Sequence, residues 1–229
     1  MNYVLDLGNV ISEEEMITLR KIIRESTHTW IHCSDHWPKE KTSPKYFIGS
    51  PIMYPMQNSY KFLANYRKLR PRSEDFLNQY SISSKVLPAI EKFYNRPAEM
   101  LPDASQPGFE VYSSFNGRNN YFDSKYFHID NCSVDYWEDL RFDPANKPQL
   151  TEIHASITPI ELPKIGQGTE LEYKTPEGIL KTKYTEGNCY IWKSDMPHRP
   201  TYIELGEGEL RICFILFFVL KPNKIFYYI

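Results

Sequence analysis

Residues 187–214 read GNCYIWKSDMPHRPTYIELGEGELRICF, and this stretch decides the predicted fold. Runs rich in aromatic and β-branched residues occupy 188–193 and 198–204, and a third run begins at residue 209. Segments that carry Gly, Pro, Ser and Asp separate these runs, a pattern typical of short β-strands joined by turns. The Gly-Glu-Gly sequence at 206–208 predicts a turn that joins the second and third runs as an antiparallel pair.

The strand pattern extends upstream of this stretch as far as Gly108. It gives eight candidate strands, near residues 109–115, 124–130, 151–158, 169–173, 179–184, 188–193, 198–204 and 209–220. Eight short strands preceded by helices predict a jelly roll, in which two sheets face one another. We expect the helices to pack on the outer face of the roll.

The N-terminal half instead carries helical patterns. Ser12 followed by Glu15 predicts a capping box. Four apolar residues behind it recur at near-helical spacing: Ile17, Leu19, Ile22 and Ile23. These signals predict a helix over residues 13–25, and two more helices are expected near 58–68 and 84–95.

The predicted fold class is mainly β with N-terminal helices, around a double-stranded β-helix core of the jelly-roll, cupin-like type. At 229 residues the chain is long enough for one such domain with a substantial core. The pattern changes near residues 102–107. We therefore expect a single domain over 1–229, with helical support from 1–104 and a jelly-roll core over 105–220, which would carry the functional site.

Composition argues against several functional classes. The 27 basic and 29 acidic residues give a net charge of -2 without a long block of one sign, which argues against a basic nucleic-acid-binding surface. The N-terminus lacks the pattern of a secretory signal, and the most apolar stretch, 212–220, is too short to span a bilayer. Four widely spaced cysteines predict free thiols and a cytoplasmic protein: Cys33, Cys132, Cys189 and Cys213.

The segment YFHIDN carries the first candidate metal ligands. His128 and Asp130 lie two residues apart, so in a strand they point to the same face. His198 begins another predicted strand, with four predicted strands between, enough to bring the chain back around a roll. Two His and one carboxylate leave three coordination positions of the metal open. Iron(II) needs these open positions to bind a chelating cosubstrate and oxygen together. Zinc more often keeps one open position.

Arg211 adds a geometric argument for a bound diacid. If the turn at 206–208 joins two antiparallel strands, Arg211 pairs with roughly residue 202, about 13 Å from His198 at ~3.3 Å per residue. A guanidinium at that distance could hold the far carboxylate of a small diacid whose other end chelates iron. Its planar fork and permanent charge suit this role.

His128-x-Asp130, His198 and Arg211 thirteen residues later resemble the iron(II)- and 2-oxoglutarate-dependent dioxygenase superfamily, most of all its prolyl-hydroxylase-like branch. The likeness covers roughly residues 105–220. The family has a distorted jelly-roll core, uses Fe(II) with 2-oxoglutarate and O2 as cosubstrates, and releases succinate and CO2. Its members usually hydroxylate their substrate, so the resemblance implies a hydroxylase.

Two further features belong to this resemblance. Residues 168–173, GTELEY, are similar to the family's glycine-containing strand between the two ligand sites. By match of position, Tyr112 could hydrogen-bond the 2-oxoglutarate carboxylate. An ordinary core aromatic is the competing interpretation of Tyr112.

Several motifs have alternative interpretations. His28, His32 and His36 would share one face of a helix and form a second metal site, but their segment is a poor helix former. Residues 131–150 could be a lid, a binding loop or an ordinary surface excursion. Arg199 could face the pocket or the solvent.

The leading hypothesis is a dioxygenase that hydroxylates a small molecule, such as an amino acid or a natural-product intermediate. A protein side-chain hydroxylase is the second hypothesis within the same class. The rival from another class is a cupin-type metal-binding isomerase or sensor that consumes no oxygen. Arg211 discriminates between the classes, because such a protein does not need a buried cation thirteen residues past its last ligand.

Overall fold

The computed structural model describes residues 3–35, 41–49, 71–100, 108–114, 119–123, 126–130, 152–165, 167–220 and 222–228. Its helices are α1 (Glu13–Glu25), α3 (Pro71–Tyr80) and α4 (Ser83–Tyr94), with short 3-10 turns η1 (Thr27–Thr29) and η2 (Cys33–Asp35). Its strands are β1 (Val4–Asn9), β2 (Ile31–His32), β3 (Lys45–Ile48), β4 (Ala98–Met100), β5 (Gly108–Tyr112), β6 (Tyr121–Phe122), β7 (Glu152–Glu161), β8 (Glu170–Thr175), β9 (Gly178–Lys183), β10 (Asn188–Lys193), β11 (His198–Pro200), β12 (Ile203–Glu204), β13 (Arg211–Leu220) and β14 (Ile225–Tyr228).

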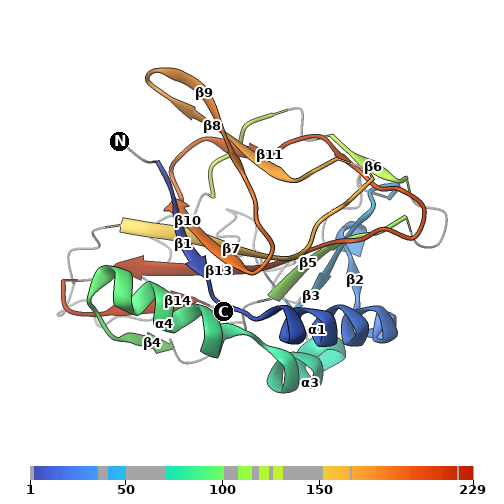
Figure 1. The fold of residues 1–229 in the computed structure, drawn as a ribbon, viewed down its shortest axis with the longest axis horizontal. Helices are drawn as coiled ribbons and strands as arrows, with labels where there is room; N and C mark the ends of the chain where they lie inside the picture. Colours follow the sequence, from blue (N-terminus) through green and yellow to red (C-terminus); the bar gives the residue numbers. More distant parts are fainter. Residues whose placement is uncertain are drawn as a thin grey trace.

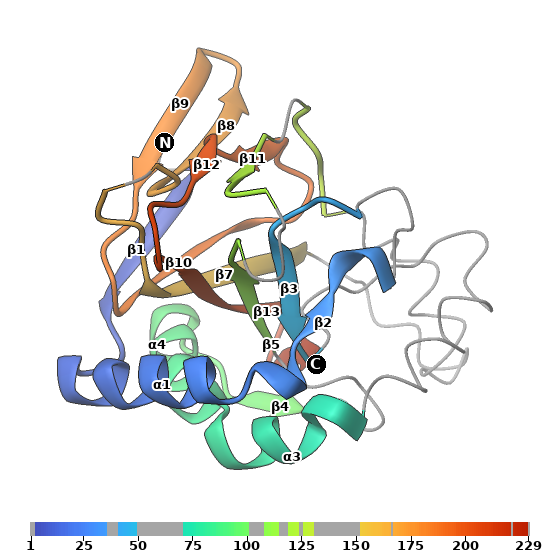
Figure 2. The same cartoon turned by 90° about the vertical axis from the view of Figure 1, so that its right-hand side faces the viewer.

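The described strands form a jelly roll from one large sheet, one small three-stranded sheet and a separate two-stranded pair. The large sheet has the order β1-β10-β7-β13-β5-β3-β2, and β14 extends it by pairing with β13 and β4. The small sheet has the order β11-β8-β9, and β12 pairs with β6. In Figures 1 and 2, the small sheet faces one side of the large sheet and the helices lie along the other. The predicted fold class is confirmed.

Alternation along the large sheet produces two separate cores. On the helix side, Phe109, Val111, Ile212 and Phe214 pack with helix residues such as Ile23. On the inner side, Ala155, Trp192, Cys213 and Phe217 pack against residues of the small sheet such as Leu171. On each strand of the large sheet, the residues that lie between helix-side core residues therefore face the inside of the roll.

Helix α1 confirms the predicted helix and its capping box. Ser12 accepts a hydrogen bond from the Glu15 N–H, and the Glu15 carboxylate accepts one from the Ser12 N–H. Met16, Leu19 and Ile23 are buried, whereas Ile17 is 57% exposed and lies off the buried face.

The other helix predictions have mixed outcomes. Helix α4 confirms the prediction for 84–95 within one residue and ends where Asn95 adopts a left-handed conformation, φ 52°. The prediction for 58–68 lies outside the described residues, and α3 was not predicted.

Most predicted strands are present, with two corrections. The run 198–204 is split into β11 and β12, which pair with different partners, β8 and β6. Of the run 124–130, residues 126–130 are described, and they form an isolated bridge at His128 rather than a strand. Residues 3–100 also contribute strands β1 to β4, which the sequence patterns did not predict.

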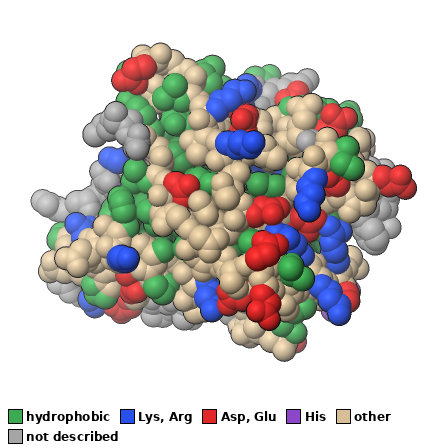
Figure 3. Space-filling view, viewed as in Figure 1, with side chains coloured by type: hydrophobic (Ala, Val, Ile, Leu, Met, Phe, Trp, Pro, Cys, Tyr) green, Lys and Arg blue, Asp and Glu red, His purple; other side chains and the backbone are tan. Residues whose placement is uncertain are grey.

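The face of the molecule seen in Figure 3 carries mixed charge. On the face in Figure 3, acidic and basic side chains are interspersed. Within the described residues, no helix is both long enough and apolar enough to cross a membrane.

Candidate metal centre

The backbone brings His128 and His198 together. The His128 N–H donates to the His198 carbonyl at 2.9 Å, and the His198 N–H donates to the His128 carbonyl at 2.8 Å. The two imidazoles consequently lie side by side, with ring centroids 4.5 Å apart. This antiparallel bridge links a segment between β6 and β7 to the start of β11.

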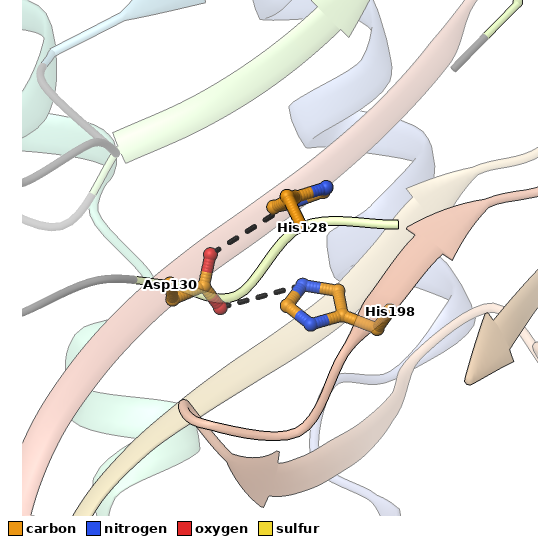
Figure 4. A group of neighbouring side chains, drawn as sticks. All are labelled: His128, Asp130 and His198. Carbon is orange, nitrogen blue, oxygen red and sulfur yellow. Dashed lines mark ion pairs between the residues drawn. The ribbon is translucent and has the colours of Figure 1, made fainter. Parts of the chain in front are cut away.

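Asp130 completes the group from the same segment (Figure 4). Its N–H donates to the Ser194 carbonyl at 2.9 Å, which anchors the residue next to the loop before β11. Its carboxylate oxygens lie 3.9 Å from His128 Nε2 and 3.4 Å from His198 Nε2. One potential ligand atom from each of the three residues falls within 4.8 Å of the others. The predicted ligands are thus assembled in one cluster.

The hydrogen bonding of His198 presents a lone pair to this cluster. Its Nδ1 lies 2.8 Å from the Met196 carbonyl, which can only accept, so Nδ1 donates there and Nε2 is the ring nitrogen that faces the cluster. A backbone acceptor of this kind fixes the tautomer and ring orientation of many metal-bound histidines. The Trp192 ring, edge-on at 5.2 Å, packs against the His198 imidazole.

The electrostatics of the cluster also suit a cation. Partial burial and the neighbouring His198 lower the pKa of His128 to about 4, which favours a neutral imidazole near pH 7. Burial raises the pKa of Asp130, although His198 opposes that rise. A partly buried carboxylate beside two imidazoles gains most from a bound cation, which offsets its lost hydration.

Trp192 is a neighbour of the cluster that sequence reasoning did not identify. Its indole N–H is buried and makes no hydrogen bond of ordinary geometry with a described residue. It lies close enough to Asp130 to lower the pKa of that carboxyl. An indole N–H so placed can orient the carboxylate oxygen that faces away from a metal.

Arg211 lies inside the roll with 1% of its surface exposed. Its Nε donates to the Gly168 carbonyl at 3.0 Å, and its Nη1 donates to Glu110 Oε1 at 3.2 Å. Arg211 is directly opposite Tyr112 of β5. The predicted pairing with roughly residue 202 is therefore wrong, because β12 leaves β13 and pairs with β6 instead.

Tyr112 and Tyr184 place two phenol groups near Arg211. Both side chains are buried, and neither hydroxyl makes a hydrogen bond of ordinary geometry with a described residue. Arg211 acts electrostatically on both phenols, whose pKa values burial raises. A buried hydroxyl that makes no hydrogen bond destabilises the folded protein. The two phenol groups beside the Arg211 guanidinium are therefore consistent with a polar ligand that binds inside the roll.

Lys45 and Glu110 are the charged residues of this interior that the sequence patterns did not single out. Lys45 Nζ is 2.5 Å from Glu110 Oε2. A signal did exist for Glu110, because it lies two residues before Tyr112 in GFEVY and must share its face. Lys45 lies in a short strand whose inner face is defined only by pairing with β5.

The remaining candidates lie away from the metal cluster. Arg199 points to the outer face, where it pairs with Glu172 at 2.7 Å and covers the Phe127 ring. His28 is in a 3-10 turn and His32 is in a strand, so the helix needed for a second metal site is absent there, and His36 is not described. The His128 cluster is the one group of potential metal ligands that the described part of the chain contains.

The cysteines and the long segment after Asp130 have different outcomes. Cys33, Cys189 and Cys213 are buried free thiols. Burial raises the pKa of Cys189 to about 12 and that of Cys213 to about 11, so neither is a nucleophile near pH 7.

Cys132 and the predicted loop 131–150 lie outside the described residues.

Comparisons with known proteins give a match in structure. No family model matches the sequence, and no curated protein matches it significantly. An N-substituted L-amino acid dioxygenase from Burkholderia ambifaria AMMD superposes with a TM-score of 0.51 and 9% identity, over 96% of this chain and 84% of that chain. A 2OG-Fe(II) oxygenase family oxidoreductase from Burkholderia pseudomallei gives 0.50 and 10%, over 99% and 84%. At such low identity these likenesses show a shared fold, the one predicted from the sequence.

Proposed function

We propose that this chain is an iron(II)- and 2-oxoglutarate-dependent dioxygenase of the prolyl-hydroxylase-like branch, which hydroxylates a small molecule and releases succinate and CO2. The observation that carries the proposal is the cluster of His128, Asp130 and His198 on a roll whose interior buries Arg211. One end of a diacid would reach the metal and the other would reach the guanidinium. The shared fold agrees with this arrangement.

The donor set fits iron(II). Two neutral imidazoles and one carboxylate on one side of the ion leave positions for a chelating cosubstrate and for oxygen. When bound, iron and 2-oxoglutarate supply the oxygen activation, and the protein supplies orientation and exclusion of water. Arg211 would bind the distal carboxylate through its fork, and the buried Tyr112 hydroxyl would donate to the same group.

The substrate would approach from the side of His128. The His128 side chain is 51% exposed, whereas that of His198 is 5% exposed. An amino acid is the first substrate class to test, because one of the solved structures with this fold is a dioxygenase of N-substituted L-amino acids. A protein side-chain hydroxylase is the second candidate. The buried free thiols favour a cytoplasmic location, and the mixed surface charge gives no support to a nucleic-acid partner.

A cupin-type isomerase or sensor would use the same three ligands without consuming oxygen. Such a protein does not need a cation inside the roll, where Arg211 has 1% of its surface exposed. Addition of 2-oxoglutarate to the anaerobic Fe(II) protein should produce a visible metal-to-ligand absorption band. A panel of amino acids and related small molecules should then give succinate and a product one oxygen atom heavier. Absence of the band and of succinate would reject the dioxygenase in favour of the cupin-type alternative.

A further inference from the structure

Three charged side chains form an ion triad inside the roll. Glu110 lies between Lys45 and Arg211, 2.5 Å from Lys45 Nζ and 3.2 Å from Arg211 Nη1. The exposed fractions of the three side chains are 9% for Glu110, 19% for Lys45 and 2% for Arg211. Among the described residues of this largely buried site, two cations against one carboxylate leave one positive charge in excess.

Strand register places both cations at the same level. Lys45 on β3 and Arg211 on β13 are each directly opposite Tyr112, which lies on the strand between them. Directly opposite residues on neighbouring strands point to the same face of a sheet. Lys45 Nζ is 5.5 Å and Arg211 Cζ is 5.3 Å from the Tyr112 ring centroid. The two cations thus flank one ring whose hydroxyl has no ordinary hydrogen bond with a described residue.

The triad faces the metal ligands across the interior. The charges of Lys45 and Glu110 contribute to the pKa of both His128 and Asp130. The triad and the metal ligands therefore lie within electrostatic reach of one another.

The excess positive charge of the triad predicts that an anion binds there. An ion pair of Glu110 with Arg211 alone would be neutral, so Lys45 is not required to balance a charge. Burial alone would lower the pKa of Lys45, but the adjacent carboxylate outweighs it and raises that pKa, so the lysine is charged near pH 7. A buried charge in excess is costly unless a ligand pairs with it.

We propose that Lys45 and Arg211 together bind the distal carboxylate of the cosubstrate, and that Glu110 holds both cations in place and limits the site to one carboxylate. This inference rests on the proposed function and adds Lys45 as a second anchor. Glu110 is then a positioning residue, because it acts through the two cations.

The test compares 2-oxoglutarate with 2-oxopentanoate, which has the same chain but a methyl group in place of the distal carboxylate. Affinities of both acids are measured by calorimetry on the Mn(II)-loaded protein, which avoids oxidation. The ratio of the two dissociation constants reports on the distal site alone, because a general defect in folding or metal binding weakens both acids alike. Lys45→Met, Lys45→Arg, Glu110→Gln and the Lys45→Met/Glu110→Gln double variant are compared with wild type.

We expect Lys45→Met to lower the preference for 2-oxoglutarate at least about tenfold, since a charged contact is lost and Glu110 then repels the ligand. Lys45→Arg should recover part of it. Glu110→Gln should lower the preference by less than Lys45→Met does, because both cations remain but are held less firmly, and the double variant should fall between the two single variants. Lys181→Met is the control, because Lys181 pairs with Glu172 on the small sheet.

The outcomes separate this inference from the proposed function. An unchanged preference in Lys45→Met, with a reduced one in Arg211→Lys, would overturn the role of Lys45 and leave the dioxygenase assignment intact. A loss of preference in Glu110→Gln as large as that in Lys45→Met would show that the pair is structural. If the wild type shows no preference between the two acids, the distal site is refuted, and succinate release then decides the function by itself. If the wild type binds neither acid, both proposals fail.

Discussion

His128 and His198 are joined by two reciprocal backbone hydrogen bonds, so the protein pairs two candidate metal ligands without using their side chains. The geometry of the cluster is therefore set by strand pairing before any ion binds. Removal of an imidazole should leave the pairing, and the fold, largely intact.

The first prediction follows from this pairing. His128→Ala and His198→Ala should each reduce iron affinity at least about tenfold, because loss of even an outer partner of a ligand typically costs that much. Circular dichroism should remain that of the wild type, and iron is measured by elemental analysis after dialysis. His154→Ala is the matched control, since that buried imidazole contacts Tyr94 and Phe218 instead. Full iron occupancy in His198→Ala would reject the site.

The second prediction concerns the guanidinium of Arg211. Arg211→Lys keeps the charge but loses the fork and the Nε contact with Gly168. Loss of a buried charged contact typically costs about 2–5 kcal/mol, so affinity for 2-oxoglutarate should fall at least about tenfold. Arg199→Lys, on the outer face beside Glu172, should leave that affinity unchanged. Equal affinities for both variants in a titration would place the anchor elsewhere.

The third prediction concerns Trp192. Trp192→Phe keeps an aromatic ring against His198 but removes the buried N–H beside Asp130. Iron affinity, measured by competition with a chelator, should fall about tenfold, as for other groups that orient a ligand. Trp30→Phe removes a different buried N–H, which donates to the Ile23 carbonyl at 3.2 Å. That control should lower the melting temperature without changing iron affinity; an effect on iron as large as that of Trp192→Phe would contradict the assigned role.

The fourth prediction is a pH dependence that Lys85 and the capping box produce together at Glu15. Lys85, followed by the Ser12 N–H and hydroxyl, lowers the pKa of Glu15 from 4.5 to about 2. A folded-state pKa below the unfolded value means that the stabilisation is present above pH 4.5 and is lost as the pH falls toward 2. Glu15→Gln should therefore show a smaller loss of unfolding free energy than wild type over this interval. Glu14→Gln, one residue away and outside the box, should follow the wild-type curve.

Local chemistry made much of the structure predictable. The capping box defined α1 because it depends on residues three positions apart, and runs of aromatic and β-branched residues between turn-forming residues defined β7, β10 and β13. The His128-x-Asp130 spacing identified two ligands from residues two positions apart. Each of these patterns depends only on residues that are close together in the sequence.

Long-range pairing was not predictable in the same way. The Gly206–Gly208 turn suggested a hairpin, but Arg211 pairs with Tyr112, about a hundred residues earlier in the chain. Lys45 has no local signal, since its place beside Arg211 follows from β3 and β13 both pairing with β5. The position of Lys45 inside the roll thus depends on the order of the strands in the large sheet, which local sequence patterns do not predict.

The last prediction uses two glycines with similar backbone conformations and different surroundings. Gly168 has φ +113° and Gly178 has φ +130°, so an alanine is strained at either position. At Gly168 a Cβ would also lie 2.9 Å from Ile203 Cγ1 and 3.2 Å from Ile203 Cα, whereas at Gly178 nothing lies within 4 Å. Gly168→Ala should therefore lose more unfolding free energy than Gly178→Ala, by at least about 1 kcal/mol, when both are unfolded in urea.

The two variants should also differ in ligand binding. The Gly168 carbonyl accepts the Arg211 Nε–H, so a shift of the backbone away from Ile203 moves the acceptor that orients the guanidinium. Affinity for 2-oxoglutarate should fall in Gly168→Ala and stay unchanged in Gly178→Ala, whose site is at the β8–β9 turn. If both alanines destabilise the protein equally and neither changes affinity, contact with Ile203 does not set the position of Gly168, and Arg211 does not depend on that carbonyl.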